Sequence, residues 1–195
     1  MHRLHYDEAA IGYQVAKEVA RLHYRITCLR DDVLHKLTTR LANCYGIIGL
    51  EDLNLKGLLN VSRAVLPLMV ERGTGHVVNI GSTAGHQVYP GGNVYNATKF
   101  GVKALSEGMN LDVAGTQVRV SSVDPGHVES EFALVRFHGD AERAKKIYEG
   151  FRPLSPDDVA DAVSYVVNAP EHVNIADLII LPAAQRSVHL IDREK

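Results

Sequence analysis

The chain has 195 residues, 46% of them hydrophobic, and a formal net charge of −2. This length suits one domain with a substantial core, and the mixed charge indicates a globular protein. A net charge so close to zero creates no strong field toward nucleic acid or an anionic membrane, so we expect neither as a partner. No apolar run is long enough to span a bilayer, and the opening MHRLHYDEAA lacks a signal-peptide apolar region, so we expect a cytoplasmic protein.

The two cysteines, Cys28 and Cys44, have neither metal-binding nor redox spacing. We interpret them as small buried side chains in a reducing compartment. The ten histidines are scattered along the sequence without ligand spacing, so no metal site is expected.

The first part of the chain predicts two helices around one short strand. Apolar residues recur at helical spacing over Asp7–Leu22, and Arg25–Leu29 reads as a strand. Asp31 or Asp32 can cap a second helix that runs to about Asn43.

After that, strands and helices alternate, which predicts an α/β fold: a parallel sheet with helices on both faces and a ligand crevice at the carboxyl ends of the strands. A cap at Ser155 followed by Pro156 begins one of the helices. The segment Gly126–Gly150 reads as a loop with one or two helices over the crevice. The expected long elements are the helices Leu50–Arg72 and Asn93–Ala114 and the strands His76–Ile80, Gln117–Val123 and Leu178–Leu181.

One stretch carries recognisable chemistry, NIGSTAGHQVYPGGNVYNATK, which begins at Asn79. Tyr95 and Lys99 are one helical turn apart and share a face, and Ser82 joins them if its loop folds back over the strand end. A nearby ammonium lowers the pKa of a phenol from its usual value of about 10, so that Tyr95 could exchange a proton with an alcohol. Tyr13 and Lys17 have the same spacing without this context, and we interpret them as a surface pair.

Ser82, Tyr95 and Lys99, together with Asn54 and the Pro125-Gly126 loop, resemble the short-chain dehydrogenase/reductase family. The words GSTAG, YPGGNVYNATK, VRFHGDAERAKKIY and PEHVNIADLIILP are similar to its NADP-dependent serine/3-hydroxy acid dehydrogenases. This resemblance runs from about Gly46 to Ala184 and implies a Rossmann-like, doubly wound parallel sheet that is incomplete in its N-terminal half.

The resemblance also implies roles for individual residues. Tyr95 would be the general acid/base, Ser82 would hold the substrate oxygen, and Asn54 would hold a water for proton relay. Lys99 would lower the pKa of Tyr95 and bind the cofactor ribose. The cofactor would be NADP, with NAD as the less favoured choice, and its expected contacts are Gly12, Arg30, Asn43, Gly46, Tyr95, Lys99, Pro125, Gly126, Val128 and Ser130. Arg30 could contact a 2′-phosphate, although an exposed surface charge is the plainer interpretation.

Before Gly46 the family pattern is broken. Only Gly12 remains of the glycine-rich turn, and Asp7 and Glu8 stand where a phosphate would approach. No room exists for the family's third strand, its helix and its fourth strand. We therefore predict one Rossmann-like domain over 1–195, with a degenerate cofactor-binding part at 1–45 and a well-matched catalytic part at 46–195, and weakened cofactor binding.

Two functions follow from these observations. The first is an NADP-dependent oxidoreductase that acts on a secondary alcohol or carbonyl, such as a serine-like 3-hydroxy acid. The second is a catalytically silent, truncated relative that acts as a dimerising binding protein. In either case the resemblance implies a homodimer or homotetramer, assembled through the helices Leu50–Arg72 and Asn93–Ala114.

Overall fold

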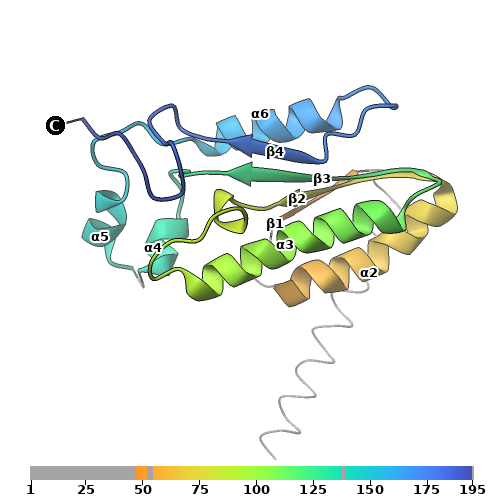
Figure 1. Cartoon of the computed structure of the whole chain (residues 1–195), viewed down its shortest axis with the longest axis horizontal. Coiled ribbons are helices and arrows are strands. Elements are labelled where there is room, and N and C mark those ends of the chain that lie inside the picture. Colours follow the sequence, from red (N-terminus) through yellow and green to blue (C-terminus); the bar gives the residue numbers. More distant parts are fainter. Residues whose placement is uncertain (1–46, 52–54, 138, 195) are drawn as a thin grey trace, which may run out of the picture.

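The computed structural model describes residues 47–51, 55–137 and 139–194. Within them, strands pair in parallel to form one sheet of order β1-β2-β3-β4 (Figure 1). Parallel neighbours require crossover connections, and helices supply most of these. The strands are β1 (Ile47–Glu51), β2 (Thr74–Ile80), β3 (Gln117–Pro125) and β4 (Asp177–Ile180).

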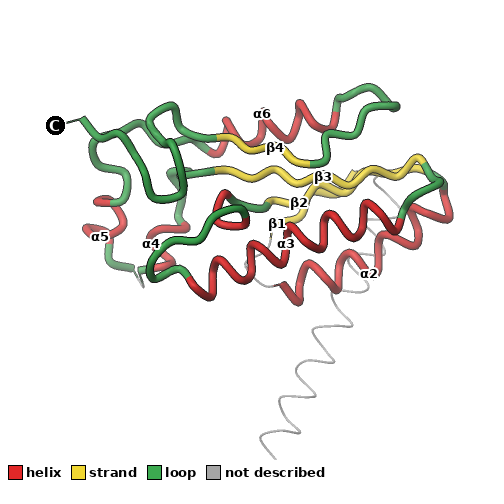
Figure 2. Tube along the Cα trace, viewed as in Figure 1, coloured by secondary structure: helices red, strands yellow, loops and turns green. Residues whose placement is uncertain are grey.

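Helices cover both faces of this sheet, as Figure 2 shows. The helices α2 and α3 lie along one face and α6 packs on the other, which confirms the predicted doubly wound α/β class. The helices are α2 (Leu55–Arg72), α3 (Asn93–Asp112), α4 (Phe132–Arg136), α5 (Ala141–Lys146) and α6 (Pro156–Val167), with a short 3-10 turn, η1 (Thr83–Gly85).

Alternation along the strands divides the core between the two faces. On β2, Val77 packs with the α2 and α3 side chains, whereas Val78 packs with Val166 of α6. The cluster under α2 and α3 is the larger one and consists of Val65, Met69, Val77, Met109, Val113, Val118 and Val120. This core fixes the strand ends, and hence the loops after β2 and β3, relative to α3.

The helix beginning predicted at Ser155 is confirmed. Ser155 is the N-cap of α6, its side chain accepts from the backbone of Asp158, and the Asp158 carboxylate accepts in return from the Ser155 backbone. Pro156 occupies the first turn, where its missing N–H costs nothing.

The predicted start of the long helix at Leu50 is wrong. Ile47–Glu51 is a strand, paired in parallel with β2 from Ile47↔His76 to Glu51↔Ile80, and α2 begins only at Leu55. The apolar run IIGL satisfies its backbone by pairing with the sheet edge that β2 would otherwise expose. The elements expected before Asn43 lie outside the described residues.

None of the helices in the described part of the chain combines the length and apolar character that a membrane span requires.

Candidate active site

The turn after β2 places Ser82 at the carboxyl end of the sheet. Ser82 is the N-cap of η1, and its Oγ accepts a hydrogen bond from the backbone N–H of Ala84 at 3.1 Å. Gly85 allows this turn to lie directly on α3, because a Cβ there would stand 2.7 Å from the carbonyl oxygen of Lys99. Ser82 is consequently held beside the helix that carries Tyr95 and Lys99.

Lys99 is anchored under the same turn. Its side chain is buried, and its Nζ donates to the carbonyl oxygen of Ile80, the last residue of β2, at 3.1 Å. The same nitrogen lies 5.9 Å from the centroid of the Tyr95 ring. The structure thus brings the predicted ammonium and phenol together, on one face of α3.

Asn96 is a buried residue that the sequence interpretation overlooked. Its side-chain amide donates to the carbonyl oxygens of Ala84 at 2.9 Å and Gln87 at 3.0 Å. It therefore fastens the loop between η1 and α3 next to Tyr95. No spacing rule could have found it, since its partners are backbone atoms.

The loop after β3 forms the opposite wall. The N–H of Gly126 donates to Ile180 at 2.8 Å, and the N–H of His127 donates to the buried side chain of Gln185 at 3.0 Å. Tyr148 donates its hydroxyl hydrogen to the carbonyl oxygen of Val128 at 2.8 Å. These bonds tie the loop to β4 and to the residues after α5.

A cavity of about 230 Å³ lies between these walls. It lies at the carboxyl ends of β2 and β3, as predicted for the ligand crevice. Among the described residues that border it, none is an Asp or Glu, and the basic ones are Lys99, His127 and Arg136. It is lined by seven of the predicted site residues: Ser82, Tyr95, Lys99, Pro125, Gly126, Val128 and Ser130.

The other predicted positions cannot be compared with this cavity. Gly12, Arg30, Asn43 and Gly46, expected at the cofactor, lie outside the described residues, and so does Asn54, expected in the proton relay. Their roles stay predictions.

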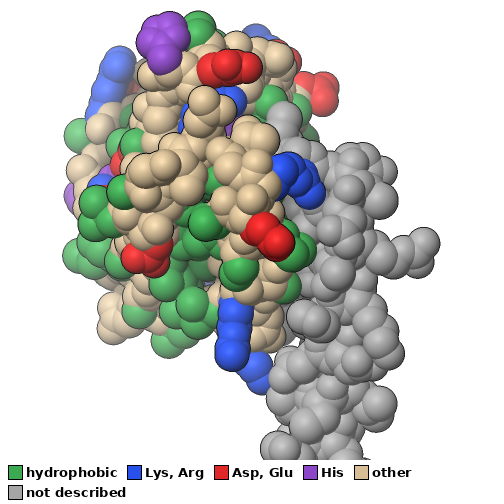
Figure 3. Space-filling model, turned by 90° about the vertical axis from the view of Figure 1, so that its right-hand side faces the viewer, with side chains coloured by type: hydrophobic (Ala, Val, Ile, Leu, Met, Phe, Trp, Pro, Cys, Tyr) green, Lys and Arg blue, Asp and Glu red, His purple; other side chains and the backbone are tan. Residues whose placement is uncertain are grey.

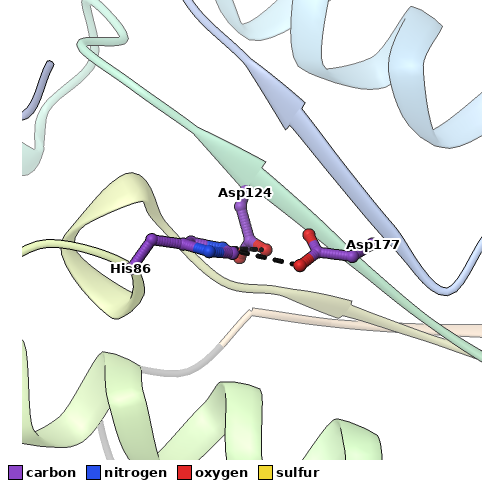
Figure 4. Close-up of side chains that lie close together, drawn as sticks. All are labelled: His86, Asp124 and Asp177. Atoms are coloured by element: carbon purple, nitrogen blue, oxygen red, sulfur yellow. Dashed lines mark hydrogen bonds and ion pairs between the residues drawn. The ribbon is translucent and has the colours of Figure 1, made fainter.

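A cluster of titratable side chains, His86, Asp124 and Asp177, joins the end of η1 to β3 and β4 (Figure 4). His86 Nε2 is 2.9 Å from a carboxylate oxygen of Asp124 and 3.7 Å from one of Asp177. The histidines look scattered in the sequence, but the fold brings this one beside two carboxylates from β3 and β4. Such a trio resembles a set of metal ligands.

The ammonium group of Lys103 already contacts this cluster and supplies a positive charge beside its carboxylates. Lys103 Nζ lies 3.1 Å from His86 Nδ1 and 3.7 Å from Asp177. An ammonium can only donate, so Lys103 donates to Nδ1 of His86, and the hydrogen on Nε2 is donated to Asp124. Burial, followed by the hydrogen bond with Asp177, raises the pKa of Asp124 to about 6, against the lowering effect of His86. The cluster therefore acts as a tie between η1 and the end of β3.

Comparison with known proteins accounts for this architecture. A family model described as short chain dehydrogenase matches residues 46–139, which include Ser82, Tyr95, Lys99 and the Pro125-Gly126 loop. This part of the chain belongs to the short-chain dehydrogenase/reductase family.

Individual relatives are similar over much the same region. The NADP-dependent 3-hydroxy acid dehydrogenase YdfG of Escherichia coli (strain K12) is 50% identical over 135 residues, which are 69% of this chain and 54% of the relative. The NADP-dependent 3-hydroxy acid dehydrogenase of Schizosaccharomyces pombe is 36% identical over 142 residues, which are 73% of this chain and 55% of the relative. The chain thus spans about half the length of the curated relatives that it matches.

A solved structure of the family supports the same fold. The closed form of serine dehydrogenase complexed with NADP+ is 48% identical and superposes with a TM-score of 0.67, over 72% of this chain and 57% of that one.

A second family model, described as a probable transposase, matches residues 10–62. It overlaps the dehydrogenase match only at its end, and most of it lies outside the described residues. The segment that we interpreted as a degenerate cofactor-binding part therefore also resembles a different kind of protein. The division of 1–195 into a degenerate part and a catalytic part of one domain remains a prediction.

Proposed function

We propose that this chain is a cytoplasmic, homodimeric enzyme that oxidises a small 3-hydroxy acid with NADP, or reduces the corresponding carbonyl compound. The observation that carries the proposal is the placement of Ser82, Tyr95 and Lys99 on one cavity at the carboxyl end of a parallel sheet. The printed names of the matched relatives, NADP-dependent 3-hydroxy acid dehydrogenases, support the substrate class and the cofactor.

The hydrogen-bonding pattern of the site suits proton transfer to and from an alcohol. Ser82 Oγ accepts from Ala84, so its own hydrogen is available for the oxygen of the substrate. Tyr95 would take the hydroxyl proton as the alcohol becomes a carbonyl. The ammonium of Lys99, fixed by Ile80, would stabilise the phenolate form of Tyr95.

The cavity also fits the nicotinamide end of the cofactor. Pro125, Gly126, Val128 and Ser130 form one wall of it, and no described carboxylate lines it that would repel a phosphate. NADP, when bound, supplies the acceptor for the hydride. Lys99 would bind the ribose, and NAD is the less favoured cofactor.

A spectrophotometric assay tests the proposal. The purified full chain is mixed with NADP+ and 3-hydroxypropanoate, and the absorbance of NADPH is followed, with NAD+ in parallel reactions. We expect reduction of NADP+ to exceed that of NAD+. No reduction of either cofactor, with a correctly folded protein, would overturn the enzymatic proposal.

Two observations favour a second candidate, a catalytically silent relative that dimerises. Residues 10–62 match a family model other than a dehydrogenase, and the relatives are about twice as long. Calorimetric titration with NADPH separates the two candidates. A dimer that releases no heat with NADPH would favour the silent relative, whereas saturable binding would favour the enzyme, even if it is weak.

A further inference from the structure

We propose that Arg136 binds the carboxylate of the substrate and thereby selects hydroxy acids over neutral alcohols. The inference rests on the proposed function, since it names the residue that recognises the acid group of the same substrate. None of the predicted site residues carries this role.

Arg136 is the accessible cation of the cavity. It ends α4, borders the cavity of Ser82 and Tyr95, and also lines a neighbouring hollow formed with Gly91–Val94 and Thr98. The other Lys or Arg among the described lining residues is Lys99, which is only 3% exposed and donates to Ile80. Lys99 thus contacts Tyr95 and the end of β2, whereas Arg136 is an exposed residue on the border of the cavity.

The guanidinium is held by aromatic rings rather than by an acid. Its Cζ lies 5.7 Å from the centroid of Tyr89 and 5.8 Å from that of Phe137. Within the described part of the chain, no ion pair involves Arg136. Cation–π contacts of this kind use none of the guanidinium N–H groups as hydrogen-bond donors to an acid, so these groups are available for a bidentate carboxylate.

The surroundings make this end of the cavity positive. No described Asp or Glu lines the cavity. Burial lowers the pKa of His127, and the charges of Arg193 and Arg136 lower it further, while its contact with Gln185 opposes them. His127 is therefore neutral near pH 7, and the charge that an anion meets there is that of Arg136.

The expected substrate is a short carboxylic acid with its hydroxyl group two carbons from the acid carbon. The hydroxyl would lie between Ser82 and Tyr95, and the carboxylate would reach Arg136 on the rim. A neutral amide of the same size can reach the same place, but it gains no charge-assisted bond.

Arg136→Gln tests this selection, with Arg143→Gln as the matched control. Arg143 of α5 also stacks on Phe137, at 4.5 Å, but does not line the cavity. With 3-hydroxypropanoate, we expect Arg136→Gln to lower kcat/KM about tenfold to a hundredfold, mainly through KM, because a charged hydrogen bond is lost. With neutral 3-hydroxypropanamide, the variant and the wild type should be equal, and Arg136→Lys should retain part of the preference for the acid. Equal effects on acid and amide would overturn the inference.

A binding measurement separates this inference from the proposed function. NMR titration of the isotope-labelled full chain with 3-hydroxypropanoate and its amide requires no turnover. If the wild type binds the acid more tightly than the amide and Arg136→Gln abolishes the difference, the inference stands, even for a protein that reduces no NADP+. If the wild type shows no preference for the acid, or Arg136→Gln retains it, the inference is wrong. Matching melting temperatures of the wild type and the three variants, Arg136→Gln, Arg136→Lys and Arg143→Gln, show that the fold is intact.

Discussion

The Nζ atom of Lys99 lies 3.1 Å from the carbonyl oxygen of Ile80 and 5.9 Å from the centre of the Tyr95 ring. The first contact holds the ammonium in place, and the second puts its charge beside the phenol. A lysine side chain is long and flexible, so without the strand-end carbonyl its position would vary. The end of β2 thus helps to orient the acid–base pair on α3.

Replacing Lys99 by Met should remove this charge while keeping much of the buried volume. We expect turnover to fall by at least about a hundredfold, the usual contribution of a positioned acid–base system. We also expect about 1 kcal/mol of lost stability, because the carbonyl of Ile80 loses its donor. Steady-state kinetics and urea unfolding measure the two effects. Lys145→Met, at an exposed position of α5, is the control and should leave turnover within a few-fold of the wild type.

Gly85→Ala should damage the site by displacing the turn that carries Ser82. The added Cβ would meet the carbonyl oxygen of Lys99 at 2.7 Å, so the turn η1 must move away from α3. We expect a lower melting temperature and a lower kcat. Gly108 lies on α3, and nothing is within 4 Å of a Cβ added there. Gly108→Ala should therefore stabilise the protein by about 0.5–1 kcal/mol. If Gly85→Ala keeps wild-type kcat, the close packing of η1 is not needed for catalysis.

His76 should make the protein less stable in mild acid. This side chain is 2% exposed, its Nε2 lies 2.7 Å from Ser121 Oγ, and burial, aided by the charge of Arg119, lowers its pKa from 6.5 to about 4. Between these two values the unfolded chain binds the extra proton and the folded one does not. The stabilising contribution is thus complete above pH 6.5 and is lost as the pH falls toward 4.

The size of this effect follows from the pKa difference. A shift from 6.5 to about 4 corresponds to about 3 kcal/mol of unfolding free energy. Urea unfolding of wild type and His76→Gln at pH 4 and 7 isolates it, because Asp124, which titrates in the same range with opposite sign, is present in both. We expect the wild type to lose more stability on acidification than the variant. Parallel losses in the two proteins would contradict the assignment.

The predicted dimer can use only part of the apolar surface that the sequence suggests for the helices Leu50–Arg72 and Asn93–Ala114. The residues expected to supply the contact are Leu58, Leu59, Val61, Val65, Leu66, Val102, Leu105, Met109 and Val113. Five of them, Leu58, Val65, Val102, Met109 and Val113, are buried in this chain's own core, whereas Leu59 is exposed.

The exposed large apolar residues of α2 and α3 are Leu59, Val70, Val94, Phe100 and Leu111, at 45%, 39%, 80%, 41% and 77% exposure. In Figure 3, hydrophobic side chains gather in the lower half of the molecule, at the level of these helices. A patch of this kind favours a two-fold, self-complementary contact.

Charging this patch should therefore break the dimer. We expect light scattering to give a dimer mass for the wild type and a monomer mass for Phe100→Glu, since an unpaired carboxylate would be buried at the contact. Tyr165→Glu, at an aromatic position on α6 that is more exposed than Phe100, should leave the dimer intact. A monomeric wild type at micromolar concentration would refute the prediction.

Local sequence was sufficient for the centre of the site. Ser82, Tyr95 and Lys99 fall in one strand–turn–helix stretch, so their spacing and the helical period predict their convergence. Apolar periodicity also predicts the helix α3 and the strand β3, and the predicted ends lie within a few residues of the observed ones.

Contacts between distant segments could not be predicted in this way. The pairing of His86 with Asp124 and Asp177 depends on the register of β3 with β4, and the position of Arg136 depends on how α4 returns over the cavity. The strand β1 was missed because IIGLE borders a helix and carries no alternation of its own. Its strand character comes from pairing with β2, which is a tertiary effect.

Turnover of Tyr95→Phe tests the central claim most directly. The Phe ring can keep the contact of Tyr95 with Phe132, at 5.7 Å between ring centres, so only the ionisable oxygen is lost. With NADP+ and 3-hydroxypropanoate, we expect the variant to lose all measurable reduction of NADP+, while its melting temperature stays that of the wild type. Tyr95→Phe with wild-type turnover would show that another group moves the proton, and would contradict the account.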